Sequence, residues 1–164
     1  MKNILWFMLI VISAVMAYHG WLISASGHTL LELQFVCAGK GAEILGNWSK
    51  YYAGDRVLLD VARLNTKIEF LFIVVYVLQL ITLSNALMQR ERSVFINELL
   101  RMNLMLAVLL GLLDVSENII QLHNFHFPSA TMMYISTLYL SIVKWVLAAW
   151  ILVVLVTSRF KRFF

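Results

Sequence analysis

Residues 102–122 read MNLMLAVLLGLLDVSENIIQL and decide the fold. The stretch is mostly apolar, and its length is close to the roughly 20 residues that an α-helix needs to cross about 30 Å of hydrocarbon. Asp114, Glu117 and Asn118 interrupt it at spacings of three and four residues, which places them on one face of the helix. The stretch therefore predicts a transmembrane helix whose polar face is turned toward other helices.

Three other stretches have a similar length and apolar character. The first carries no formal charge, and it is too long for the core of a signal peptide, so we interpret it as a retained helix. The last is longer than a bilayer requires, which indicates a tilted helix. The predicted helices cover about residues 4–24, 67–88, 101–122 and 130–158. The predicted fold class is all-α: a polytopic membrane protein with four transmembrane helices in one domain, residues 1–164.

The composition supports a membrane protein. Apolar residues make up 62% of the 164 residues and charged residues 13%, whereas soluble domains are about half apolar and a quarter charged. The formal net charge is +4, from 13 Lys and Arg against 9 Asp and Glu, and the basic residues lie mainly in the connections and at the end of the chain. We therefore expect them to contact membrane lipids and predict no nucleic acid partner.

The long first connection, about residues 25–66, contains five of the seven glycines. Leu31 to Phe35 alternate apolar and polar residues, which weakly indicates a strand. Residues 42–52 are typical of a short interfacial helix. Asp55 is suited to cap a further helix with an apolar and a charged stripe. Such an amphipathic element usually lies flat on the membrane, so we expect the connection to be interfacial.

The distribution of basic residues predicts the orientation. Seven of them share one side if the N-terminus is cytoplasmic: Lys2, Arg90, Arg92, Arg101, Arg159, Lys161 and Arg162. The opposite side has five, spread over the long first connection. The preference of basic residues for the cytoplasmic side is weaker in long connections than in short ones. We therefore expect both termini to be cytoplasmic, in a bacterial cytoplasmic membrane.

Lys144 lies well inside the fourth predicted helix. A charge at the centre of a transmembrane helix costs about 2.5–3.5 kcal/mol on insertion scales, so Lys144 is expected to approach Asp114 or Glu117. Because the third helix is expected to end near residue 122, Lys144 should lie several ångströms deeper than Asp114.

Other polar residues are expected around this pair. The candidate ligand-binding or polar-core residues are Asp114, Glu117, Asn118, Lys144, Glu69, His19, Tyr76, Gln79 and His123. Three interpretations stay open for them: polar contacts that hold the helices together, a site for a ligand or ion, and side chains that snorkel to the interface.

The sequence offers little for other chemistries. His123 and His126 are three residues apart, but Pro128 and the neighbouring phenylalanines indicate a loop, and no further ligand set accompanies them. No Gly-x-Ser-x-Gly, P-loop or Cys-x-x-Cys motif occurs. We predict no catalytic residue, no metal site and no cofactor.

Several pieces of the chain resemble a family of uncharacterised bacterial four-helix membrane proteins. The matching pieces are residues 31–35, 43–48, 70–72 with Tyr76, 111–118 and 143–145. Gly-Leu-Leu-Asp-x-x-Glu-Asn at residues 111–118 is the most specific, and Glu69 stands where the family pattern has an aspartate. The resemblance implies the four-helix architecture and the importance of these polar residues, and it implies no particular activity.

A looser similarity of layout connects the chain with emopamil-binding and sigma-2-like proteins, which have four spans, a long first loop and intramembrane carboxylates around a sterol-sized pocket. The leading prediction is a non-enzymatic membrane component that forms a homo-oligomer or joins a larger membrane complex. The alternatives are a binder or transporter of a lipid-like or cationic ligand, a lipid-modifying enzyme, and an oligomeric pore-forming effector.

Overall fold

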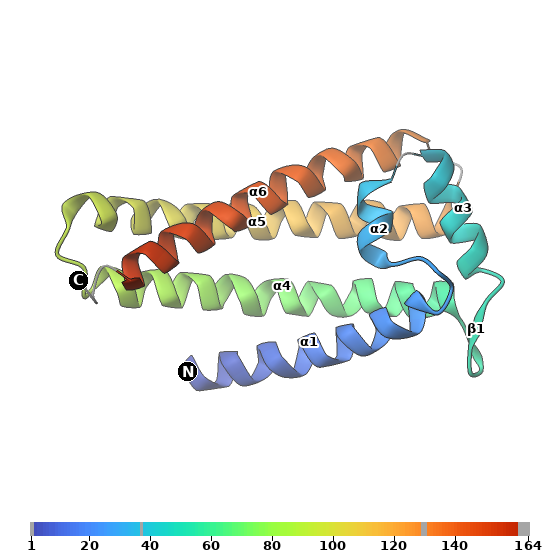
Figure 1. Ribbon diagram of the computed structural model, residues 1–164, viewed down its shortest axis with the longest axis horizontal. Coiled ribbons are helices and arrows are strands. Elements are labelled where there is room, and N and C mark those ends of the chain that lie inside the picture. The colour runs from blue at the N-terminus through green and yellow to red at the C-terminus, as the bar shows by residue number, and fades with distance from the viewer. Residues whose placement is uncertain (1, 37, 129–130, 161–164) are drawn as a thin grey trace.

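A computed structural model describes residues 2–36, 38–128 and 131–160. Within them, four helices each contain an apolar stretch long enough to cross a membrane. They are α1 (Lys2–Ser24), α4 (Leu58–Met88), α5 (Val94–His126) and α6 (Thr131–Phe160) (Figure 1). The predicted all-α architecture with four spans is confirmed. Lys161 and Arg162, which the sequence assigns to the cytoplasmic side, lie outside the described residues.

The first connection folds into a small cap, defined here as residues 25–57. It contains α2 (Leu30–Phe35), α3 (Ala38–Trp48) and a hairpin of β1 (Tyr52–Ala53) and β2 (Arg56–Val57). Figure 1 shows the cap at one end of the bundle, where α1 ends and α4 begins, with the start of α1 and the end of α6 toward the opposite end. We call these the cap end and the terminal end.

The predicted strand in the first connection is wrong, because Leu31 to Phe35 belong to the helix α2. The hydroxyl of Thr29 accepts a hydrogen bond from the backbone N–H of Glu32 at 3.0 Å and so caps this helix. Five alternating residues are a weak strand signal. The capping threonine decides the local structure.

The predicted flat amphipathic helix is also absent as a separate element. Asp55 does not cap a helix but occupies the two-residue loop of the hairpin. Gly54 precedes it with φ of 63°, the positive value that a type II′ turn requires at its first central position. α4 then continues without a break from Leu58 to Met88. Val61 and Ala62 are buried against the cap, which gives the apolar stripe a protein partner instead of the membrane surface.

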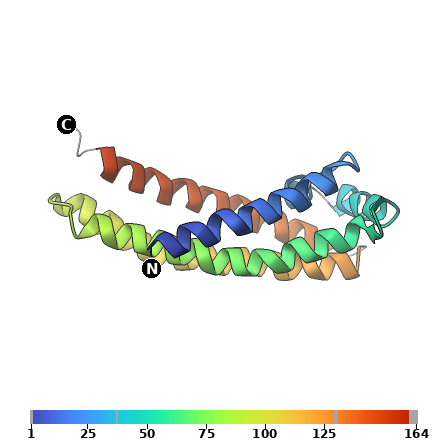
Figure 2. The ribbon, with the colours of Figure 1, turned by 90° about the horizontal axis from the view of Figure 1, so that it is seen from below.

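The four long helices pack in two layers. α4 packs against α5, α5 packs against α6, and α1 packs mainly against α4. Figure 2 shows α1 and α6 on the same side of the α4–α5 pair. Near the terminal end, a core that includes Leu100, Leu110, Ile151 and Leu155 joins α5 and α6.

Gly111 allows α4 and α5 to approach closely. A Cβ atom at this position would lie 2.7 Å from Cγ2 of Val77, closer than real side chains pack. Tyr76 neighbours Val77 on α4, and Asp114 lies one helical turn after Gly111 on α5. The missing side chain of Gly111 therefore brings together the two helices that carry Tyr76 and Asp114.

Candidate functional site

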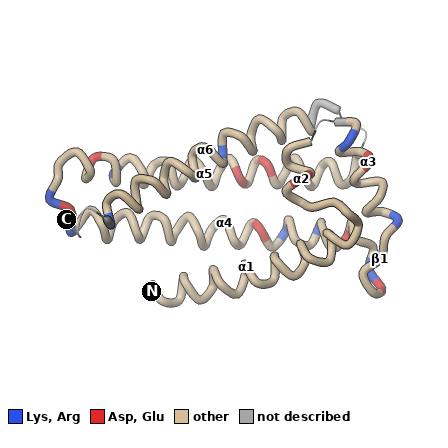
Figure 3. Tube along the Cα trace, viewed as in Figure 1, with Lys and Arg blue, Asp and Glu red and all other residues tan. Residues whose placement is uncertain are grey.

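The centre of the bundle holds an ionic cluster made by α5 and α6. The ammonium of Lys144 lies 2.9 Å from Oδ1 of Asp114 and 2.6 Å from Oε2 of Glu117. These three side chains are at most 9% exposed. Figure 3 shows that most other charged residues gather at the two ends of the bundle. The prediction that Lys144 approaches at least one carboxylate is confirmed.

Each carboxylate of the cluster has a second partner. The hydroxyl of Tyr76 donates a hydrogen bond to Oδ2 of Asp114 at 3.0 Å. The side-chain amide of Gln121 donates to Oε1 of Glu117 at 2.9 Å. Both oxygens of Asp114 and Oε1 of Glu117 accept hydrogen bonds, while Oε2 of Glu117 forms an ion pair with the Lys144 ammonium. Asp114, Glu117 and Lys144 together carry a formal charge of −1.

The expected mismatch in depth between Lys144 and Asp114 is wrong. α5 continues to His126, four residues beyond the predicted end of the third span. At 1.5 Å per residue, Asp114 lies about 18 Å from the cap end of α5, and Lys144 lies about 20 Å from Thr131 at the start of α6. The two side chains thus meet at similar depth, and the lysine need not bend far along the membrane normal.

A cavity of about 550 Å³ lies beside the cluster. Its lining comes from all four long helices and from α2. On α4 it extends from Asn65 to Leu83, a distance of about 27 Å along the helix axis. Leu30, Leu31 and Gln34 of α2 line it as well. The cavity is therefore elongated along the bundle, and its volume is in the range of small-molecule sites.

The lining changes from polar to apolar along the cavity. The polar residues are Gln34, Asn65, Glu69, Tyr76, Gln79, Asp114, Gln121 and Lys144, most of them in the half nearer the cap. Toward the terminal end the lining is apolar and includes Trp6, Leu9, Leu80, Leu83, Leu152 and Leu155. The cavity is thus amphipathic along its length.

Several polar atoms in this lining are buried and have no hydrogen-bond partner. They include both polar atoms of the Gln79 amide, Oδ1 of Asn65 and Oε1 of Gln34. Gln79 and Asn65 are only 3% exposed. Most buried polar groups in proteins are hydrogen-bonded, so these unpartnered atoms are exceptions that lie within the packed wall of the cavity.

The structure separates the predicted site residues into three groups. Asp114, Lys144, Glu69, Tyr76 and Gln79 line the cavity. Glu117 and Asn118 are fully buried inside the bundle. His19 and His123 are not among the lining residues. The ring of His19 lies beside that of Tyr18. His123 is exposed, and its ring packs against Phe127. It belongs to the last turn of α5 and not to the loop that Pro128 suggested.

Sequence reasoning missed Gln121, Asn65 and Gln34. Helical spacing could have found two of them: Gln121 lies four residues after Glu117, and Asn65 lies four residues before Glu69. Gln34 offers no such signal, because it lies on α2, which the sequence indicated as a strand.

The described side chains offer no metal site, and the serine next in sequence to Glu117 lies away from the acidic cluster. Among the described residues, no group of three or more His, Cys, Asp or Glu side chains is arranged to hold a metal ion. Ser116, next in sequence to Glu117, is exposed and donates its hydroxyl proton to the carbonyl of Leu112 at 2.8 Å, away from the cluster. The cluster gives a fixed polar wall beside an apolar chamber.

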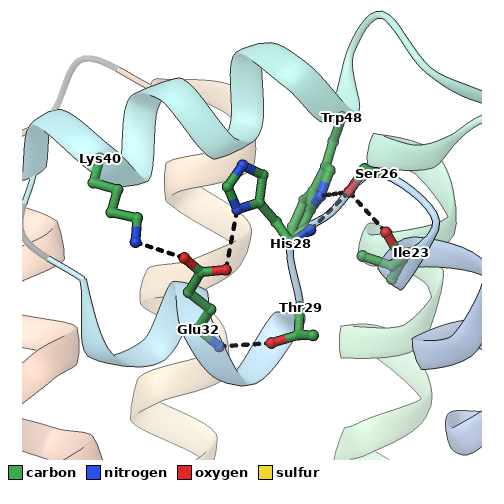
Figure 4. Close-up of polar contacts among 7 residues, drawn as sticks. All are labelled: Ile23, Ser26, His28, Thr29, Glu32, Lys40 and Trp48. Atoms are coloured by element: carbon green, nitrogen blue, oxygen red, sulfur yellow. Dashed lines mark hydrogen bonds and ion pairs between the residues drawn. The ribbon is translucent and has the colours of Figure 1, made fainter.

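A second ionic group lies in the cap, near the α2 part of the cavity wall. Figure 4 shows the carboxylate of Glu32 between Lys40 and His28. Oε1 lies 2.7 Å from the Lys40 ammonium, and Oε2 lies 3.0 Å from Nδ1 of His28. Hydrogen bonds from Lys40 and from His28 lower the pKa of Glu32, and the bond to Glu32 raises the pKa of Lys40. Glu32 therefore ties α2 to α3.

Comparison of the chain with protein-family models, curated proteins and solved structures finds no match. The resemblance to the bacterial four-helix family stays a prediction that rests on residues 111–118 and the accompanying pieces. The functional argument therefore rests on the cluster and the cavity.

Proposed function

We propose that the protein binds an amphipathic, lipid-like molecule in the cavity. The polar head lies beside Glu69 and Asp114, and the apolar tail lies along Leu80, Leu83 and Leu152. The observation that carries this proposal is the polar-to-apolar gradient of one elongated cavity, whose polar end includes Asn65, Glu69 and Asp114. A polar head would contact these side chains, and a hydrocarbon tail would fill the apolar part.

The packing of the helices supports access from the bilayer. α1 packs mainly against α4, and α6 packs mainly against α5, so the cavity between α1 and α6 is bounded by helices from different packing pairs. A molecule dissolved in the membrane already has its tail in hydrocarbon, so movement into this cavity requires little change in the surroundings of the tail.

The proposal is tested by filling the cavity. Trp6 and Trp145 line it and provide intrinsic fluorescence. In a nonionic detergent, an alkyl amphiphile with bromine on its chain should quench this fluorescence in a saturable manner. Ala148→Phe places a ring in the cavity and should weaken saturable quenching about tenfold or more, because overpacking costs on the order of 1–3 kcal/mol.

Ala149→Phe is the matched control, because Ala149 is exposed on the outside of the same helix and does not line the cavity. It should bind the brominated amphiphile like the wild type. Quenching that never saturates, or that is equally strong in Ala148→Phe and Ala149→Phe, would exclude the cavity as the binding site.

The proposal keeps the predicted non-enzymatic role and favours the ligand-binding alternative over catalysis. Homo-oligomerisation or attachment to a larger membrane complex stays a prediction that native mass spectrometry in detergent tests. We also propose a bacterial cytoplasmic membrane and cytoplasmic termini, with the cap on the outer side. A reporter that fluoresces only in the cytoplasm should be bright when fused after Phe164.

A further inference from the structure

The wall of the cavity has more negative than positive charge. The carboxylates of Asp114 and Glu117 share the single ammonium of Lys144. Glu69 adds a third carboxylate, which lines the same cavity as Asp114 and Lys144. With every group ionised, this part of the bundle has a formal charge of −2 from three carboxylates and one ammonium.

Glu69 has no basic partner of its own. Among the described residues, no Lys, Arg or His side chain forms an ion pair with it. The nearest basic residues along α4 have other surroundings: Lys67 is exposed, and Arg63 binds Asp60 and the carbonyl of Phe125. A carboxylate at this depth without a cation is costly, so a cation supplied from outside the chain would stabilise it.

The surroundings of Glu69 favour an organic cation over a metal ion. No described group of side chains has the ligand set of a metal site. Instead, Phe72 and Tyr76 follow Glu69 on the same face of α4, with ring centroids 5.4 Å apart and planes tilted by 58°. Aromatic faces attract ammonium groups.

We propose that the head group of the bound amphiphile is a cationic amine, held by the carboxylate of Glu69 beside Phe72 and Tyr76. This inference rests on the proposed function and narrows it to a ligand class. It also assigns different roles to the carboxylates. Asp114 and Glu117 hold Lys144 and shape the wall, and Glu69 supplies the counter-charge for the ligand.

The test compares alkyl probes that have the same brominated chain and different heads: a primary amine, a trimethylammonium, an alcohol and a carboxylate. Saturable quenching of tryptophan fluorescence should show the two cations binding the wild type about tenfold or more tightly than the alcohol, since bonds to charged groups contribute on the order of 1.5–3 kcal/mol. Glu69→Gln, which keeps the size of the side chain, should lose most of this preference. Its binding of the alcohol should change little.

Glu98→Gln is the matched control, because Glu98 is exposed at the terminal end of α5, remote from the polar half of the cavity. It should keep the preference for cations. Equal affinities for the amine and the alcohol, tighter binding of the carboxylate, or an unchanged preference in Glu69→Gln would overturn the cationic head. These results would leave the proposed function standing if Ala148→Phe still prevents binding. If no head group gives saturable quenching, both proposals fail.

Discussion

The two ionic clusters of this protein have opposite composition and opposite surroundings. In the bundle, one ammonium, Lys144, lies between two carboxylates. In the cap, one carboxylate, Glu32, lies between an ammonium and an imidazole. The N–O distances are similar, 2.6–2.9 Å in the bundle and 2.7–3.0 Å in the cap. The difference lies in exposure: the bundle side chains are 0–9% exposed, and the cap side chains 22–56%.

This comparison shows that contact distance alone does not determine what an ion pair contributes. Water screens the charges of the cap and solvates any charge that loses its partner, so an exposed pair contributes little. In the bundle no water replaces a missing partner, and the remaining charge keeps its desolvation cost. Removal of a lysine should therefore have very different effects in the two clusters.

The largest effect is expected from Lys144→Met. It leaves Asp114 and Glu117 buried without their cation, and the loss of one partner of a buried pair typically costs about 3–5 kcal/mol. The variant should show a clearly lower melting temperature in detergent, measured by circular dichroism. Adding Asp114→Asn should recover part of the loss, because it removes one of the stranded charges. A melting temperature equal to that of the wild type in Lys144→Met would contradict the buried ionic core.

A smaller loss is expected when α4 and α5 are forced apart beside the buried cluster. Gly111→Ala introduces a methyl group 2.7 Å from Val77 Cγ2 and should destabilise the bundle by about 1–3 kcal/mol through overpacking. The same measurement on Gly20→Ala provides the control, since no atom lies within 4 Å of that Cβ position. Gly20→Ala should be neutral or slightly stabilising. The close approach would be disproved if both variants behaved alike.

Lys40→Met is the counterpart of Lys144→Met in the cap. It removes the shortest ion pair of Glu32, but water and His28 remain to solvate the carboxylate. We expect a melting temperature close to that of the wild type, measured side by side with Lys144→Met. A loss as large as that of Lys144→Met would show that exposure does not separate the two clusters.

The smallest effect is a dependence of cap stability on pH. The pKa of Glu32 is lowered by its hydrogen bonds to Lys40 and His28, so its stabilisation is complete above the ordinary carboxyl range and is lost as pH falls through the lowered pKa. The raised pKa of Lys40 gives the opposite limit, with stabilisation lost as pH rises through it. The rate of limited proteolysis of the cap should rise toward both low and high pH. Glu32→Gln should remove this dependence of the rate on pH. A rate that depends on pH in Glu32→Gln as it does in the wild type would contradict the role of Glu32.

The bundle could be predicted from the sequence, and the cap could not. Four apolar stretches and the cost of charges in a bilayer were enough to place Lys144 beside the carboxylates of α5. That constraint acts on every residue at membrane depth and leaves few solutions. Residues 25–57 are under no such constraint. Their structure depends on local features such as the Thr29 cap and the positive φ of Gly54, which the hydrophobic pattern does not reveal.

The candidate site was predicted in part for the same reason. Charged residues such as Asp114 and Lys144 stand out in apolar helices, whereas the uncharged amides of Asn65 and Gln121 do not. Glu69 was noticed, but its lack of a partner is a three-dimensional fact. Only the structure shows that Lys144 pairs with both carboxylates of α5, and that Glu69 has no ion pair among the described residues.

The order of the helices along the chain has a consequence for biogenesis. α1 leaves the ribosome before α4, its main partner, and it has no charged residue after Lys2, so it is stable in lipid until α4 is inserted. Lys144 belongs to α6, which is synthesised after α4 and α5. When it reaches the membrane, α4 and α5 have already delivered Tyr76, Asp114 and Glu117. The buried ammonium of Lys144 is thus inserted after the carboxylates that pair with it. A chain that stalls before α6 would leave the carboxylates of Asp114 and Glu117 unpaired in the membrane, where proteases that degrade misfolded membrane proteins could recognise them.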